Sequence, residues 1–154
     1  LVKFQDAQKL NPTILACRRI GHTFLRVGYN LRDEFAARYL PLAKQYEDAR
    51  REGNKGLMAA LSSQRKALSF MEKDILHCYK KAREAFVDGL RLANGSDLDC
   101  EAHLGILEYQ EKKRPLARVV LTRAIERYKP KNDEERTIHE YCRTLLGELG
   151  GPLH

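Results

Sequence analysis

The residues of this chain that could do chemistry are two cysteine–histidine pairs with the same spacing. Cys100 precedes His103 by three positions, and His139 precedes Cys142 by three. Residues three apart lie on one face of a helix, so each pair could present both side chains together. Two thiolates and two imidazoles are a ligand set typical of tetrahedral zinc. Alternatively, both thiols are buried as small apolar groups and both histidines are exposed. We expect this alternative and no bound metal, because four helix-borne ligands must all converge to make a site.

No other pattern in the sequence indicates catalysis. His77 and Cys78 are adjacent, and adjacent side chains on a helix point about 100° apart, too far for a thiol–imidazole pair. The sequence holds no phosphate-binding glycine loop, no nucleophile elbow and no helical zinc-protease motif. We therefore expect neither an enzyme nor a cofactor.

Positive charge is concentrated in the first half of the chain. Residues 1–77 contain 14 Lys and Arg against 8 Asp and Glu, whereas residues 78–154 contain 14 against 13. Such an excess attracts phosphates, anionic lipid headgroups or an acidic peptide. A solvated basic surface with no specific partner explains the same numbers, because both signs are mixed along each predicted helix.

The composition indicates a soluble, helix-rich domain. Hydrophobic residues make up 43% and charged residues 32% of the 154, enough for one core or a short helical array. No apolar run approaches the ~20 residues of a membrane span. The four cysteines include no CxxC pair and are expected to be reduced, which favours a cytoplasmic location. Because the chain starts at Leu1, we expect a fragment or a processed product.

Breaking residues divide the first third of the chain into two predicted helices. Asn11–Pro12 is a helix start, and Gly28–Asn30 is the predicted break. A second helix runs from Leu31 to Glu52, with a kink or a new start at Pro41. Gly21 lies beside the apolar stripe of the first helix and predicts a close crossing by another helix.

A long apolar stripe follows between Gly56 and Asn94. It predicts either a single rod or two helices that break near Ser62–Ser63. Ser96 and Asp99 then resemble a capping box, and Asn132 begins a final helix. The inner side of that final helix is expected to carry Ile138, Tyr141, Cys142, Leu145 and Leu149.

The clearest architectural signal lies between Leu98 and Lys131. Two apolar-striped segments are joined by the polar connector Glu111–Arg114, and Pro130 closes the unit. Small residues occupy the positions where the two helices would touch, which lets their backbones approach closely. These residues are Ala102, Gly105, Ala117 and Ala124.

This segment, residues 98–131, resembles one tetratricopeptide repeat, a pair of antiparallel helices of about 34 residues. The positions that match the family pattern are Leu104, Gly105, Ala117, Leu121 and Ala124. The departures are Glu101, Glu108 and Lys112, which stand where the family has Trp, Tyr and a connector glycine.

The resemblance implies an all-α fold of antiparallel helical pairs in a tetratricopeptide-like superhelix. Residues 1–154 would form one domain, with a long-helix bundle or irregular repeats over 1–95, and a repeat unit plus a capping helix over 96–154. It also implies a protein–protein interaction module, an adaptor or scaffold whose groove holds a peptide or helix, possibly acidic, from a partner. The groove residues would be Ala102, Ile106, Tyr109 and Gln110 and, on the next helix, Arg136, Glu140 and Arg143.

Two other functions fit the same sequence. A basic helical module could bind nucleic acid, although the tyrosines follow apolar seams rather than the basic clusters. Alternatively, the long helical segment between Gly56 and Asn94 could pair with its copy and form a homo-oligomer. Salt dependence distinguishes the nucleic-acid binder, because phosphate contacts weaken steeply with ionic strength.

Overall fold

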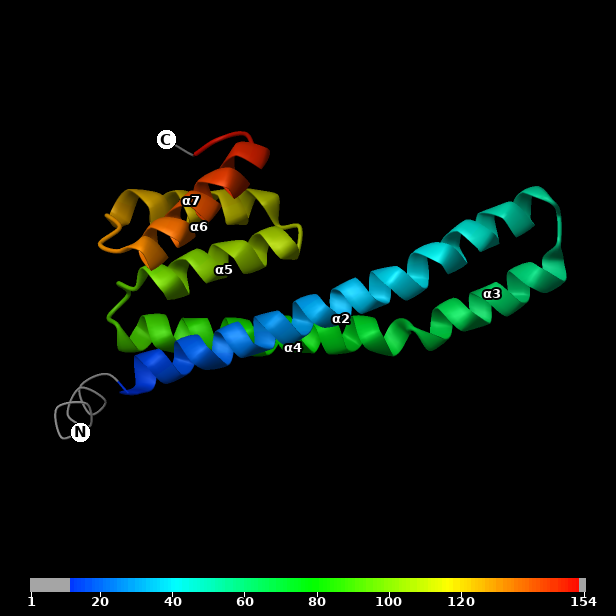
Figure 1. The fold of residues 1–154 in the computed structure, drawn as a ribbon, viewed down its shortest axis with the longest axis horizontal. Helices are drawn as coiled ribbons and strands as arrows, with labels where there is room; N and C mark the ends of the chain where they lie inside the picture. Colours follow the sequence, from blue (N-terminus) through cyan, green and yellow to red (C-terminus); the bar gives the residue numbers. More distant parts are fainter. Residues whose placement is uncertain (1–11, 153–154) are drawn as a thin grey trace. The chain divides into compact units, whose positions relative to one another are not determined.

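The computed structural model describes residues 12–152, which fold into α-helices without any strand, and this confirms the predicted all-α class. Asn11, part of the predicted first helix start, lies outside the described residues. The helices are α2 (Pro12–Arg51), α3 (Lys55–Ala67), α4 (Ser69–Leu92), α5 (Leu98–Gln110), α6 (Arg114–Arg127) and α7 (Asp133–Glu148) (Figure 1).

The chain divides into two compact units, which we describe separately. The first unit combines the chain up to His22 with the chain from Ala82 onward, and the second unit is Thr23–Lys81. Helices α2 and α4 therefore contribute residues to both units. The expected division between residues 95 and 96 falls inside the first unit.

Helix α2 continues through both places where the sequence predicted an interruption. Gly28 does not break it, because this glycine is a contact point: a Cβ there would lie 2.8 Å from the Tyr79 ring and 3.2 Å from Cys78 Cβ on α4. The predicted break at Gly28–Asn30 is therefore wrong. The helix also continues past Pro41, so no new helix starts there, and Ala49 beyond it is still buried in the seam.

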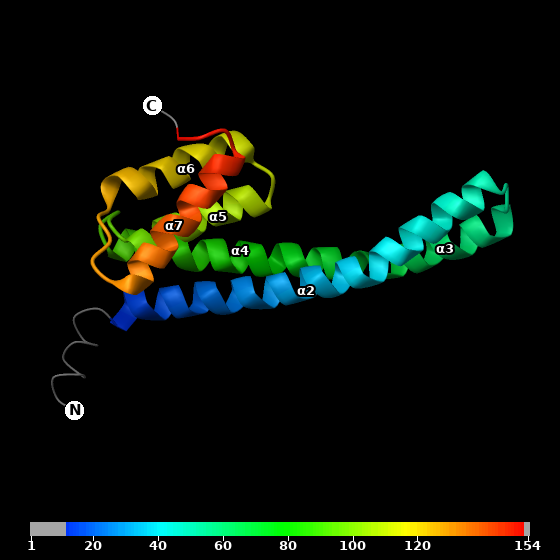
Figure 2. The same cartoon turned by 45° about the horizontal axis from the view of Figure 1, so that its top comes forward.

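The second unit is a helical hairpin that turns at Gly53 and Asn54 (Figure 2). Asn54 caps α3, its side chain accepting a hydrogen bond from the Leu57 N–H at 3.1 Å. The helical segment predicted after Gly56 is interrupted at Leu68, beyond the predicted break at Ser62–Ser63. At this interruption, the Leu68 N–H donates a hydrogen bond to the Arg65 carbonyl at 3.1 Å. The buried seam consists of Leu25, Ala49, Leu61, Met71, Ile75, Cys78 and Tyr79.

In the first unit, α5 and α6 form the predicted pair, and α7 packs against both (Figures 1 and 2). A Cβ at Gly105 would lie 2.7 Å from the Leu121 side chain and 3.2 Å from Leu121 N on α6. Ala117 is fully buried beside this contact. The close crossing predicted from small residues is confirmed. The close crossing predicted at Gly21 is also confirmed, since a Cβ there would lie 2.5 Å from the Phe86 ring of α4.

The ends of α5 and α7 determine where the polar side chains lie. Asp97, rather than Ser96, caps α5, because its carboxylate accepts the Asp99 N–H at 3.1 Å. Helix α7 begins as predicted at Asn132, whose side chain accepts the Glu135 N–H at 2.8 Å. On the inner side of α7, Leu146 is buried, whereas Tyr141, predicted there, is 44% exposed.

Candidate functional site

Two of the predicted groove residues, Ala102 and Ile106, lie inside the core. They are 0% and 3% exposed and pack in one cluster with Cys142 and Leu145 of α7. Helix α7 thus covers the face of α5 that the repeat pattern assigned to a partner. The prediction that these two residues line an open groove is wrong, because an apolar face at the end of a helical array is covered by the next helix.

The other two predicted residues of α5 lie at its C-terminal end. Tyr109 and Gln110 line a hollow of about 330 Å³ together with residues from the connector and from beyond α7. The Tyr109 hydroxyl donates a hydrogen bond to the Glu148 carboxylate of α7. This bond, with a smaller contribution from burial, raises the pKa of Tyr109.

The predicted residues on α7 are all exposed. Arg136, Glu140 and Arg143 follow one another at helical spacing on the side of α7 opposite Cys142. Arg136 also forms an ion pair with Asp133 in the first turn of the helix, at 2.5 Å. This face of α7 is open to solvent.

The structure does not bring the four possible zinc ligands together. In residues 12–152, no three of Cys100, His103, His139 and Cys142 offer ligand atoms within 4.8 Å of one another. Burial raises the pKa of the Cys100 and Cys142 thiols to about 12, so both behave as the expected apolar groups. His139, expected to be exposed, is buried instead, and its Nε2–H donates to the Ile125 carbonyl at 3.0 Å.

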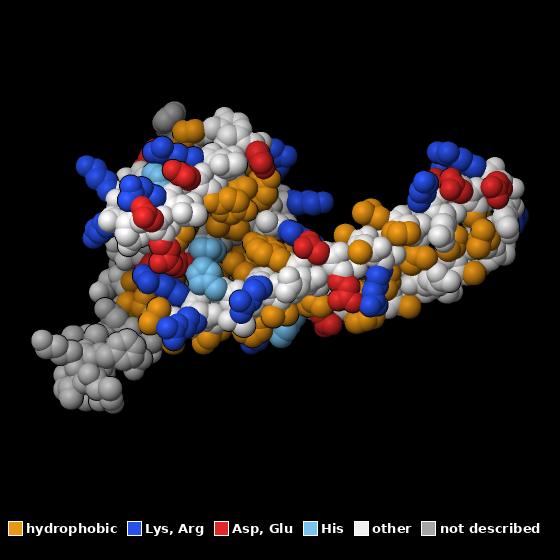
Figure 3. Space-filling view, in the orientation of Figure 1, with side chains coloured by type: hydrophobic (Ala, Val, Ile, Leu, Met, Phe, Trp, Pro, Cys, Tyr) orange, Lys and Arg blue, Asp and Glu red, His pale blue; other side chains and the backbone are white. Residues whose placement is uncertain are grey.

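One group of possible metal ligands does converge in the described part of the chain: His22 of α2 with Asp99 and His103 of α5. The His22 Nε2–H donates to Asp99 Oδ1 at 2.8 Å, and His103 Nδ1 lies 3.0 Å from the same oxygen. The two imidazole rings meet edge to face, with centroids 4.4 Å apart. Figure 3 shows histidine side chains at the surface of this unit, next to acidic and basic ones.

The neighbours of this group are an apolar wall and an ion pair. Phe86, which is fully buried, stacks on His103 with ring centroids 5.1 Å apart and meets the edge of His22 at 5.4 Å. Burial alone would raise the pKa of the Asp99 carboxyl, but hydrogen bonds from His103 and His22 hold it well below its usual range. The carboxylate is therefore ionised and acts as an acceptor.

Sequence reasoning missed this group because one of its three residues comes from a distant helix. Asp99 and His103 are four apart on α5 and were detectable as a pair on one helix face. His22, however, lies 77 positions from Asp99, and only the packing of α2 on α5 brings it there.

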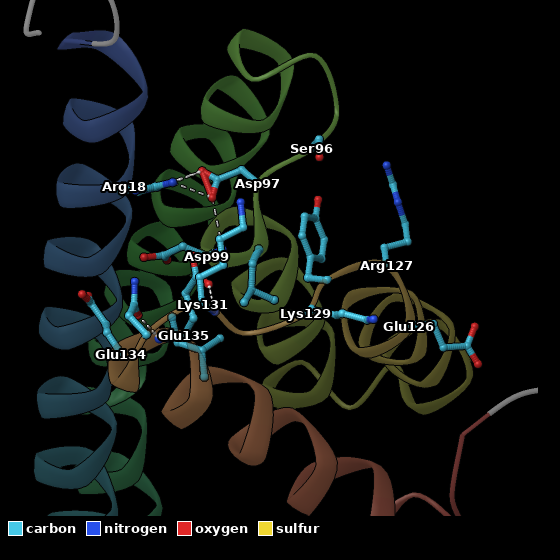
Figure 4. Close-up of a pocket in the computed structure, with 14 residues that line it drawn as sticks. Arg18, Ser96, Asp97, Asp99, Glu126, Arg127, Lys129, Lys131, Glu134 and Glu135 are labelled. Atoms are coloured by element: carbon cyan, nitrogen blue, oxygen red, sulfur yellow. Dashed lines mark hydrogen bonds and ion pairs between the residues drawn. The ribbon is translucent and has the colours of Figure 1, made fainter.

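Asp99 also borders a polar cavity of about 650 Å³, enclosed by the starts of α5 and α7 and by the loop before α7 (Figure 4). Arg18 binds Asp97 at its edge through two hydrogen bonds of 2.8 Å. The lining of this cavity carries both signs of charge, including Glu126, Arg127, Lys129, Lys131, Glu134 and Glu135. A mixed lining of this kind gives no preference for one sign of ligand.

Two of the three residues that depart from the repeat pattern, Glu101 and Glu108, form buried charge contacts. Glu101 is 2% exposed and accepts a hydrogen bond from the Tyr128 hydroxyl at 2.9 Å, with Arg127 at 3.6 Å. Glu108 is 4% exposed and binds Arg83 of α4. Carboxylates thus take places that aromatic residues hold in the family, and arginines balance them.

Comparison with known proteins adds no relative: no protein-family model, curated protein or solved structure matches this chain. Within residues 12–152, no helix has both the length and the apolar character needed to cross a membrane.

Proposed function

We propose that this chain is a non-enzymatic protein–protein interaction module, an adaptor or scaffold, that binds an acidic peptide or helix of a partner protein on the outer face of α7. The hollow at the C-terminal end of α5 extends this surface through Tyr109. In this proposal, α5 and α6 correspond to one tetratricopeptide-like repeat and α7 is the helix that follows it.

The observation that supports the proposal is the division of α7 into two faces. One face completes the core, whereas the other presents Arg136, Tyr141 and Arg143 to solvent. Tyrosine and arginine are the residues that most often dominate binding energy at interfaces, because both combine a large contact area with a polar group. Two arginines on this face favour an acidic partner.

Affinity capture with the whole chain tests the surface. We expect a partner retained by the wild type to be lost with Arg143→Glu and weakened with Tyr109→Ala. The matched control is Arg51→Glu, the same charge reversal at an exposed residue in the last turn of α2. Equal recovery of every retained protein by the wild type and by both the Arg143→Glu and Tyr109→Ala variants would refute the proposal.

Nucleic acid is the second candidate ligand, because the second unit carries the excess charge. Thr23–Lys81 contains 12 Lys and Arg against 7 Asp and Glu. Three of its aromatic residues, however, are engaged within the unit: Phe35 stacks on Tyr39 at 5.1 Å, and Arg65 covers both Tyr39 and Tyr46. They are not free to stack on bases. Binding that falls by orders of magnitude between about 50 and 200 mM salt would favour this candidate over the first.

A cytoplasmic location belongs to the same proposal. All four cysteines are free thiols, as expected in a reducing compartment. The self-assembly alternative is decided by the mass of the chain in solution, where a monomer would exclude pairing through the helical hairpin.

A further inference from the structure

We propose that His22, Asp99 and His103 form a binding site for a divalent transition-metal ion, with Zn²⁺ as the best match. The site lies within the first unit and joins the N-terminal part of α2 to the start of α5. It is independent of the interaction surface on α7.

The spacing of the ligand atoms fits one small ion. His22 Nε2 and His103 Nδ1 lie 2.8 Å and 3.0 Å from Asp99 Oδ1. A tetrahedral Zn²⁺ with bonds of about 2.1 Å places neighbouring ligand atoms about 3.4 Å apart. Separations of a few tenths of an ångström more are therefore enough to admit the ion. The fourth position is left for water or another ligand.

The ligand types select the metal. Two imidazoles and one carboxylate suit Zn²⁺ and its neighbours in the first transition series, whereas Mg²⁺ and Ca²⁺ take oxygen ligands. No cysteine sulfur is among the converging ligand atoms, and the Cys100 sulfur packs against Gly89 of α4. The site therefore uses nitrogen and oxygen only.

Binding requires the inner nitrogen of each ring to be unprotonated. A neutral imidazole can move its proton to the outer nitrogen, so no proton needs to leave the ring. His103 Nδ1 would also give up its 2.7 Å hydrogen bond to the Asp99 carbonyl. The metal bond replaces that contact, while Phe86 keeps the ring stacked in place.

Access to the site comes from the side of His22. The His22 side chain is 42% exposed, whereas those of Asp99 and His103 are 15% exposed. An ion from solvent therefore reaches the site at His22 and finds the other two ligands held on one face of α5. Such a half-buried, prearranged set binds more tightly than exposed histidines on a flexible surface.

Calorimetric titration with ZnCl₂ tests the proposal, using the whole chain purified without a histidine tag and stripped with a chelator. We expect one Zn²⁺ per chain, and at least a tenfold loss of affinity with His22→Gln and with His103→Gln. His77→Gln, an exposed histidine of α4, is the matched control and should bind like the wild type. Substoichiometric zinc in the wild type, or unchanged binding by both site variants, would overturn the proposal.

Co²⁺ absorption separates this site from zinc bound by the cysteines. We expect visible bands of tetrahedral cobalt without the near-ultraviolet thiolate-to-cobalt band, because the proposed ligands contain no sulfur. A thiolate band that survives in His22→Gln would assign the metal to cysteine instead. Circular dichroism confirms the fold of each variant, and partially exposed His22 is the variant least expected to disturb it. Loss of zinc binding would leave the partner surface on α7 unaffected.

Discussion

Helices α5 and α7 share one core but differ in how much of their circumference is covered. Helix α5 buries apolar residues on every side and, with them, the carboxylates Glu101 and Glu108. Helix α7 buries one side and leaves the other to solvent. Helix α5 is covered on all sides except at its C-terminal end, where Tyr109 and Gln110 line a hollow, so the proposed partner surface lies mainly on α7.

The same comparison explains the strength of the polar contacts. Charges on α5 are desolvated, so each one depends on a specific partner. Charges on α7 remain in water, which screens them, so removing one changes the free energy of unfolding only slightly. Four pairs of substitutions test how differently the two helices are held, and in each pair one change removes or adds a contact of α5 and the other does so for α7.

The largest effect is expected at the buried ion pair of α5. Arg83→Met leaves Glu108, whose side chain is 6% exposed, without its main counter-charge and also removes the 2.6 Å contact with Glu111. We expect a loss of about 3 kcal/mol in the free energy of unfolding, measured by urea denaturation.

The matched substitution on α7 is Arg136→Met. Its partner Asp133 is 96% exposed, so we expect a change of less than about 0.5 kcal/mol. Equal losses for Arg83→Met and Arg136→Met would show that α5 is not buried as described.

The second pair compares the N-caps. Asp97→Ala removes both the cap of α5 and the two hydrogen bonds to Arg18, and we expect a loss of about 2 kcal/mol. Asn132→Ala removes only an exposed cap of α7, and we expect about 1 kcal/mol. Urea midpoints with unchanged slopes measure both. A larger loss at Asn132 than at Asp97 would reverse the comparison.

The third pair places the same methyl group on each helix. Gly105→Ala brings a Cβ within 3.2 Å of the Leu121 backbone, and we expect a loss of about 1–2 kcal/mol. Gly147→Ala meets nothing within 4 Å, so alanine should stabilise α7 by about 0.5 kcal/mol through its helix propensity. Opposite signs in thermal unfolding are the result expected. A gain at both positions would mean that α5 and α6 do not cross closely at Gly105.

The sequence predicted what depends on local pattern. The connector between α5 and α6, the crossing at Gly105 and the Asn132 cap all follow from residue type and spacing, which act over a few positions. The predicted helix break at Gly28 was wrong. A glycine often ends an isolated helix, but here the absence of a side chain lets a second helix pack closely against α2.

The candidate metal site could not be predicted from local sequence pattern for a similar reason. Asp99 and His103 lie on one helix, but His22 joins them only through the packing of α2 on α5. The prediction of a groove on α5 was wrong because a repeat pattern does not indicate which helix will cover the apolar face of the repeat. The position of α7 over Ala102 and Ile106 depends on tertiary packing.

The smallest pair concerns the residues that end the two helices. Helix α7 is followed by Gly150, at φ 96°, whereas α5 is followed by Lys112 at φ 60°. Left-handed backbone costs a non-glycine residue about 1 kcal/mol, and part of this is offset because glycine loses more entropy on folding. We therefore expect Lys112→Gly to stabilise the chain by about 0.5 kcal/mol.

Gly150→Lys is the reverse substitution and should destabilise the chain by a similar or slightly larger amount, because φ 96° is less accessible to a residue with a side chain. Thermal unfolding resolves such differences as shifts of a few degrees. Both positions are exposed, so neither substitution changes a packed side chain. If Lys112→Gly destabilised the chain, the lysine side chain would have to contribute more than its strained backbone costs, and the end of α5 would then be held by the charges of Glu108 and Glu111.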